Sequence, residues 1–201
     1  PQTGGQVKMK AYPFSALFSR MKYITRWSLM RSTRAESLSE HTADTAMLAH
    51  TLCLIGKSCT GTGAALRPEV VATAALYHDA PEILTGDLPT PIKYYNPDIK
   101  TAYKEVERIA GNRLLDMLPP ELRSSYTHYV LEDDAELEPF VKAADKLSAH
   151  IKCLEEQKAG NTEFDSAALQ TLDALKAMNS PELEWFLNNC LQAFTLNLDQ
   201  L

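Results

Sequence analysis

Apolar residues recur at helical spacing along nearly the whole of this 201-residue chain, and no segment alternates apolar and polar residues as a half-buried strand would. A chain of this length usually forms one compact domain. We therefore expect an all-α fold, with a single helical domain over residues 11–201. Residues 1–10 contain no apolar signal-peptide core, and we expect them to be a flexible leader or a leftover of cloning.

The composition limits the kinds of molecule that this protein is expected to bind. The net charge of −6 gives no broad basic surface, so a nucleic-acid polymer is not an expected partner, although a local arginine pocket can still bind phosphate. No apolar run reaches the roughly 18–20 residues that span a bilayer, so no membrane association is expected. The 4 cysteines are scattered and form no C-x-x-C pair. We expect reduced thiols in a cytoplasmic protein.

Capping and turn residues indicate where helices begin and end. Ser39 is expected to cap the helix that follows it, and Pro68 to open the helix that ends at His78. Residues 132–138 should form a solvated acidic turn. A last helix should run over residues 181–198.

Two histidines and two aspartates lie in apolar helical surroundings, where an ionised carboxylate is costly unless it is paired or bound to a metal. They are His41, the adjacent pair His78 and Asp79, and Asp145. Neighbouring residues at a helix end point about 100° apart, so both members of the pair can reach one ion. Imidazole and carboxylate suit Mn, Fe, Co, Ni or Zn, and such an ion can turn water into a nucleophile. The pattern predicts metal-assisted hydrolysis.

A simpler interpretation stays open at this point. Asp145 could face solvent, and His41 and Asp79 could be helix caps, a role in which polar residues are common. A His-Asp dipeptide alone is weak evidence for a metal site, because such a pair also arises by chance. The wider sequence context therefore has to distinguish the two interpretations.

That context resembles a known family. The order H…HD…D is similar to the ligand pattern of the HD-domain metal-dependent phosphohydrolase superfamily. Other segments resemble the signature of the bacterial 5′-deoxynucleotidases within it: Arg20 to Arg31, Glu40-His41, His78 to Glu82, Leu84 to Tyr94, and Lys142 to Asp145. The resemblance runs from about Phe14 to the C-terminus. It implies an HD-domain helical bundle with a metal site between helices.

The resemblance also implies site roles. The ligands of the ion would be His41, His78, Asp79 and Asp145, and Glu82 would orient or deprotonate the attacking water. The substrate would contact Arg26, Trp27, His41, Asp79, Asp87, Leu88, Pro89 and Thr90, with Arg26 also stabilising phosphate charge. Without the family pattern, Arg26 would be a surface arginine and Trp27 a core tryptophan. Glu82 would then be a glutamate in the first turn of a new helix.

The expected reaction is metal-dependent hydrolysis of deoxyribonucleoside 5′-monophosphates to deoxyribonucleosides and phosphate, selective against ribonucleotides and 3′-monophosphates. The expected cofactor is one divalent ion (Co, Mn, Fe, Ni, Cu or Zn), and the resemblance implies a homodimer. Two alternatives stay open. One is hydrolysis of another nucleotide class, namely a triphosphate, cyclic dinucleotide or alarmone. The other is a non-catalytic module that binds metal and nucleotide.

Overall fold

The computed structural model describes residues 11–63, 65–93 and 95–201, so the expected leader lies outside the described residues. Within these ranges the chain forms helices without strands, apart from an isolated antiparallel bridge between Thr25 and Ser37. The all-α prediction is confirmed. The α-helices are α1 (Phe14–Phe18), α2 (Leu38–Ile55), α3 (Pro68–Tyr77), α4 (Glu82–Thr85), α5 (Thr90–Lys93), α6 (Pro97–Leu115), α7 (Pro120–Val130), α8 (Glu138–Lys158), α9 (Asp165–Ala177) and α10 (Pro181–Asn189).

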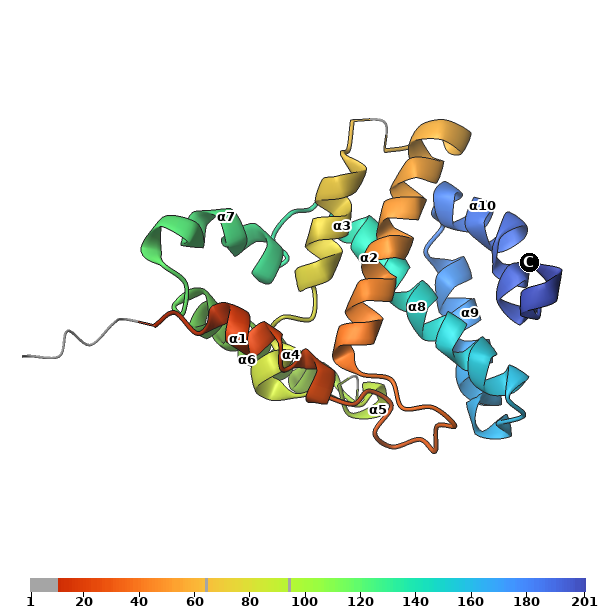
Figure 1. The fold of residues 1–201 in the computed structure, drawn as a ribbon, viewed down its shortest axis with the longest axis horizontal. Coiled ribbons are helices and arrows are strands. Elements are labelled where there is room, and N and C mark those ends of the chain that lie inside the picture. Colours follow the sequence, from red (N-terminus) through yellow and green to blue (C-terminus); the bar gives the residue numbers. More distant parts are fainter. Residues whose placement is uncertain (1–10, 64, 94) are drawn as a thin grey trace, which may run out of the picture.

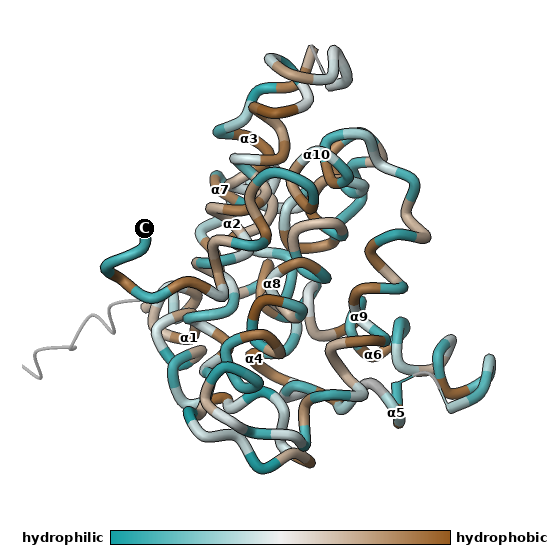
Figure 2. The backbone as a smooth tube through the Cα atoms, turned by 90° about the vertical axis from the view of Figure 1, so that its right-hand side faces the viewer, coloured by the Kyte–Doolittle hydropathy of each residue, from teal (hydrophilic) through white to brown (hydrophobic). Residues whose placement is uncertain are grey.

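The centre of the bundle is formed by α2, α3 and α8. Helix α2 packs along α3 and against α8, while α9 covers α8 and α10 covers α2 (Figure 1). Their shared core includes Leu52, Val71, Leu147 and Leu183. Apolar and polar residues form short bands along the helices (Figure 2), as expected for helices that bury one face. This core fixes the helix ends that carry the polar cluster described below.

A second apolar cluster holds the turn that follows α3. It packs Phe14, Leu114 and Val130, from α1, α6 and α7, around the fully buried Ala80. Burial of a large apolar side chain stabilises a fold by about 1.5–3 kcal/mol. Since Ala80 directly follows His78 and Asp79, these two residues lie between the central core and the second cluster.

Two predicted helix boundaries are wrong. Ser37, and not Ser39, caps α2: its Oγ accepts from the backbone N–H of Glu40 at 3.2 Å, and the Glu40 carboxylate accepts from the backbone N–H of Ser37 at 2.8 Å. This reciprocal capping box satisfies two otherwise unpaired donors. The last helix ends at Asn189, because the 3₁₀ segment Leu191–Thr195 turns back to pack against α8 and the central core.

The other predicted boundaries agree with the structure. Pro68 is the first residue of α3, and His78 directly follows its last residue. The acidic segment forms a turn over residues 132–137 that leads into α8, whose first residue is Glu138, and Glu132 within the turn has a positive φ of 49°.

Candidate metal centre

The four predicted ligands meet where α2, α3 and α8 come together. His41 lies in the first turns of α2, His78 and Asp79 follow α3, and Asp145 lies in the first half of α8. Nε2 of His41 is 3.1 Å from Oδ1 of Asp145 and 3.5 Å from Oδ2 of Asp79. Nε2 of His78 is 3.1 Å from the same Asp79 oxygen and 3.9 Å from Oδ1 of Asp145. The fold therefore brings together side chains from distant parts of the chain.

Both imidazoles direct Nε2 into this cluster, because their Nδ1 atoms have contacts elsewhere. Nδ1 of His78 donates to the carbonyl oxygen of Ala75 at 2.7 Å, and Nδ1 of His41 lies 3.1 Å from Oγ of Ser148. A carbonyl can only accept, so neutral His78 carries its proton on Nδ1 and keeps a lone pair on Nε2. Such outer contacts orient histidine ligands in metal sites.

The cluster has the properties that a bound ion would satisfy. Nε2 of His78 is buried, and although Oδ2 of Asp79 lies 3.1 Å away, it makes no hydrogen bond of suitable geometry with the described residues. Ligand atoms of His41, His78 and Asp145 all lie within 4.8 Å of one another, which suits bridging by one ion. Buried polar atoms without a partner are rare in native folds. The donor set of imidazoles and carboxylates fits a divalent transition metal.

Charges within the cluster stabilise one another. Burial alone would lower the pKa of His78, but Asp79 and Asp145 outweigh burial and hold this pKa well above its ordinary value. Burial opposes ionisation of both aspartates, yet the two histidines hold the pKa of Asp79 and of Asp145 well below the usual range. The carboxylates therefore stay ionised at neutral pH, the state in which they bind cations.

The cluster opens into a cleft of about 520 Å³. Its acidic lining includes Asp79, Glu82, Asp145 and Glu132, so the turn at residue 132 faces the cleft. Its basic lining comes from α5, α6 and α8: Lys93, Lys100, Lys104, Arg108, Lys142 and Lys146. The Asp145 side chain is 39% exposed whereas that of His41 is fully buried, so a ligand can reach the cluster from the α8 side.

Glu82 lies beside this cluster, at the start of α4, and is only 5% exposed. Nζ of Lys93 is 3.9 Å from its Oε1, and its buried Oε2 has no hydrogen-bond partner among the described residues. Burial, together with repulsion from Asp79 and Asp87, raises the pKa of Glu82 to about 9. A buried carboxyl with a raised pKa in a cleft is typical of an acid–base site.

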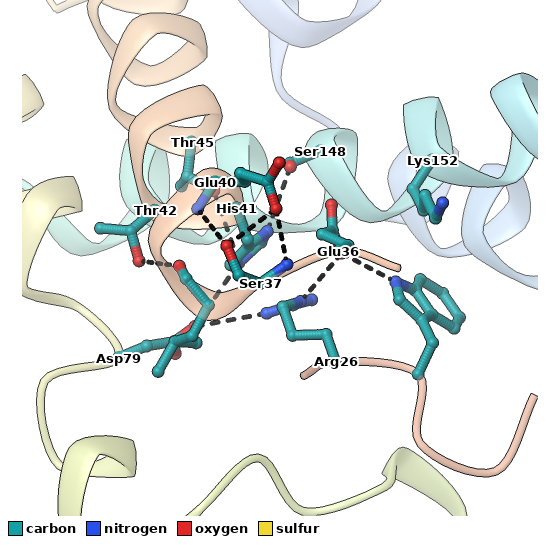
Figure 3. Close-up of polar contacts among 12 residues, drawn as sticks. Arg26, Glu36, Ser37, Glu40, His41, Thr42, Thr45, Asp79, Ser148 and Lys152 are labelled. Atoms are coloured by element: carbon teal, nitrogen blue, oxygen red, sulfur yellow. Dashed lines mark hydrogen bonds and ion pairs between the residues drawn. The ribbon is translucent and has the colours of Figure 1, made fainter. Parts of the chain in front are cut away.

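Arg26 and Trp27 lie in the loop before α2 and share one partner. The Arg26 guanidinium contacts Asp79 (Nη1 to Oδ2, 3.4 Å) and Glu36 (Nε to Oε2, 3.2 Å) (Figure 3). Trp27 Nε1 donates to the same Glu36 oxygen at 2.9 Å, and its ring packs against Phe164 with centroids 5.4 Å apart. Glu36 was not predicted from the sequence as a site residue, because no local spacing in this irregular loop indicated its contacts.

Residues 87–90 follow α4 and lead into α5. Asp87, Leu88 and Pro89 are half-buried in the loop between α4 and α5, and Thr90 begins α5. Burial raises the pKa of Asp87 and the charge of Arg26 lowers it, so Asp87 lies within electrostatic reach of Arg26. Of the described residues that line the 520 Å³ cleft, none comes from this loop or from residues 26–27.

Comparison with known proteins places this architecture in a family. The family profile described as 5′-deoxynucleotidase YfbR-like matches residues 13–194. A protein named 5′-deoxynucleotidase from Vibrio atlanticus is 45% identical over 196 residues, which cover 96% of this chain and 100% of that protein. Its namesake from Erwinia tasmaniensis is 47% identical over 190 residues, covering 94% and 95%. The chain belongs to the YfbR-like 5′-deoxynucleotidase family.

Two solved structures share the fold of this 5′-deoxynucleotidase family member. An HD-domain phosphohydrolase from Listeria innocua aligns with a TM-score of 0.77 at 19% identity, covering 92% of this chain and 89% of that one. A cyanophage S-2L HD phosphohydrolase, solved with dA and one catalytic Zn²⁺ ion, aligns with a TM-score of 0.64 at 19% identity, covering 89% and 96%. The predicted HD-domain fold is confirmed, and the chain is a hydrolase of this family. None of its described helices combines the length and apolar character needed to cross a bilayer.

Proposed function

We propose that this chain hydrolyses deoxyribonucleoside 5′-monophosphates to deoxyribonucleosides and inorganic phosphate, and that it discriminates against ribonucleotides and 3′-monophosphates. The convergence of two imidazole Nε2 atoms and two carboxylates beside the buried Glu82 carries the proposal. The names of the Vibrio and Erwinia relatives support the substrate class. So does the dA bound in the cyanophage neighbour.

One divalent ion would be held by His41, His78, Asp79 and Asp145. Bound there, it would supply positive charge for a phosphate oxygen and acidify a water molecule. The donor set accepts Co, Mn, Fe, Ni, Cu or Zn, and the Zn²⁺ of the cyanophage neighbour supports the presence of an ion of this class. His41 and Asp79 would also face the substrate.

Glu82 and Arg26 would act on the reacting groups. In its ionised form, Glu82 would accept a hydrogen bond from the attacking water at its unpaired Oε2 and take its proton. Arg26 would donate to the phosphate oxygens as charge shifts among them in the transition state. Its contact with Asp79 supports this role, because it holds the guanidinium beside a proposed ligand.

The sugar would be recognised by Trp27 and by residues 87–90. Trp27 would pack against deoxyribose, and the Asp87 carboxylate would accept from its 3′-hydroxyl. Leu88, Pro89 and Thr90 would border the same pocket. A ribose 2′-hydroxyl would clash there or lose its hydrogen-bond partners, either of which disfavours binding.

We further propose that the chain works as a homodimer in the cytoplasm. Exposed apolar residues on α6, including Val106 and Ile109, support the dimer by offering a surface for a second copy. The four cysteines are free, which fits a reducing compartment.

The test is phosphate release by metal-stripped protein supplied with Co²⁺ or Mn²⁺. Deoxyadenosine 5′-monophosphate (dAMP) is compared with AMP, deoxyadenosine 3′-monophosphate and dATP. Metal-dependent release from dAMP alone is expected. Equal release from all three monophosphates would reject the proposed selectivity, and release only from dATP would indicate a triphosphate hydrolase. Metal binding without any release would favour the non-catalytic alternative.

A further inference from the structure

Glu36 joins the two side chains proposed to bind phosphate and sugar. Its Oε2 accepts from Nε of Arg26 at 3.2 Å and from Nε1 of Trp27 at 2.9 Å. The Glu36 and Arg26 side chains are only 10% and 12% exposed, so water competes weakly for these bonds. A single carboxylate oxygen thereby sets the position of the guanidinium relative to the indole.

The backbone around Glu36 is held by a short antiparallel pairing. The N–H of Arg26 donates to the carbonyl of Glu36 at 2.9 Å, and the N–H of Leu38 donates to the carbonyl of Ile24 at 2.8 Å. Ser37, the next residue, caps α2, the helix that carries His41. Glu36 is therefore placed on a frame that is continuous with the proposed metal centre.

The backbone conformation of Trp27 has to be held by contacts with neighbouring residues. Its φ of 59° lies in the left-handed region, which strains a bulky residue and persists only where surrounding contacts enforce it. Phe164 holds one part of the ring, and Glu36 holds the indole N–H. Removing the carboxylate would take away the acceptor that fixes the direction of the indole.

We propose that Glu36 is a positioning residue that holds Arg26 and Trp27 as one unit and thereby sets the preference for deoxyribose over ribose. This inference rests on the proposed function, in which those two residues contact the substrate. Glu36 itself would not touch the reacting atoms. Without it, Arg26 keeps its contact with Asp79, so phosphate binding should suffer less than the choice between sugars.

The chain offers a graded pair of variants and a matched control. Glu36→Ala removes the acceptor, whereas Glu36→Gln keeps a neutral one of the same shape. Glu163→Ala is the control, because Glu163 accepts from the backbone N–H of Arg31 at 3.0 Å and so anchors the same loop, while among the described contacts its side chain makes none with Arg26 or Trp27. If Glu36 only kept the loop in place, Glu36→Ala and Glu163→Ala would change the kinetics in the same way.

The kinetic readout is kcat/KM for dAMP and for AMP. Glu36→Ala should raise KM for dAMP and lower the dAMP-to-AMP ratio of kcat/KM by about tenfold or more, as expected for losing a charge-assisted hydrogen bond. Glu36→Gln should lower the ratio less, and Glu163→Ala should leave it unchanged. If Glu36→Ala does not fold, the Glu36→Gln and Glu163→Ala proteins provide the same comparison. An unchanged ratio in a folded Glu36 variant would overturn the role in specificity.

A second readout needs no substrate. The indole N–H resonance of Trp27, assigned with Trp27→Phe, should move in both Glu36 variants and stay in place in Glu163→Ala. An unmoved resonance would overturn the positioning contact itself. If the unaltered protein binds metal but hydrolyses no nucleotide, the proposed function fails while the resonance still reports on Glu36.

Discussion

Oδ2 of Asp79 lies 3.1 Å from Nε2 of His78, the residue that precedes it in the chain. The contact is possible because α3 ends at Tyr77, which leaves the next two residues free to turn toward α2 and α8. The same Asp79 oxygen is 3.4 Å from Nη1 of Arg26. One carboxylate therefore connects the proposed metal ligands with the proposed phosphate-binding cation, and this connection can be tested by mutation.

Asp145→Ala should remove metal binding and hydrolysis together. The variant lacks the carboxylate oxygen that lies 3.1 Å from Nε2 of His41 and would bind the ion, so metal affinity should fall by about 100-fold or more. Metal content after dialysis and phosphate release from dAMP measure the two effects. Asp173→Ala, an exposed carboxylate on α9, is the control and should change neither. Full metal occupancy in Asp145→Ala would refute its assignment as a ligand.

Glu82→Gln should separate chemistry from binding. The amide keeps the shape of the side chain but cannot take a proton from water, so kcat should fall by about 10²–10⁴-fold. Metal content and KM for dAMP should change little, because Glu82 is not among the proposed metal or sugar ligands. Glu69→Gln, at an exposed position in α3, is the control. Near-normal turnover by Glu82→Gln would eliminate Glu82 as the base.

Metal-stripped protein should lose stability as the pH rises from about 6.5 toward 9. The pKa of folded His78 is raised above its unfolded value of about 6.5, so its stabilising contribution is complete below that pH and is lost as the pH passes its folded pKa. The pKa of Glu82, raised to about 9, acts in the same direction, because the fold disfavours its charged form. The lowered pKa values of Asp79 and Asp145 act at acid pH, where their contribution is lost as the pH falls through the folded values.

Thermal unfolding in chelator across this pH range measures the effect. Added Co²⁺ should reduce or reverse the decline, because histidines bind a metal only when neutral. Glu82→Gln in chelator should decline less steeply than the unaltered protein. A midpoint of thermal unfolding that rises with pH in chelator over the same range would contradict the raised pKa values of His78 and Glu82.

Glu156→Ala should strongly destabilise the fold. Glu156 is 1% exposed, accepts from the backbone N–H groups of Thr33 at 2.8 Å and Arg34 at 3.3 Å, and pairs with the buried Lys152 at 2.5 Å. Removing one partner of a buried ion pair costs about 3–5 kcal/mol. Urea unfolding measures this loss, with the exposed Glu155→Ala as the control. A loss of unfolding free energy no larger than that of the control would show that the loop containing Thr33 and Arg34 does not depend on Glu156.

Helical periodicity predicted most of the helices, because a buried helix face leaves a regular apolar pattern in the sequence. Helix ends were harder to predict. Ser37 and Ser39 are equally good caps by residue type, but only Ser37 has a glutamate three residues later, and Glu40 forms the reciprocal bonds that this spacing allows. Helix α10 ends early because Leu191 and Phe194 pack back onto the central core, a preference that comes from tertiary contacts.

By itself, the sequence determined that the chain is helical and that His41, His78, Asp79 and Asp145 lie in apolar segments, where such groups require a partner. Local spacing and residue chemistry are sufficient for both conclusions. Only the tertiary structure decided that these side chains meet, that Oε2 of Glu82 is buried without a partner, and that Glu36 joins Arg26 to Trp27. Such relationships depend on side-chain directions in segments that the fold brings together from distant positions, and no local pattern encodes those directions.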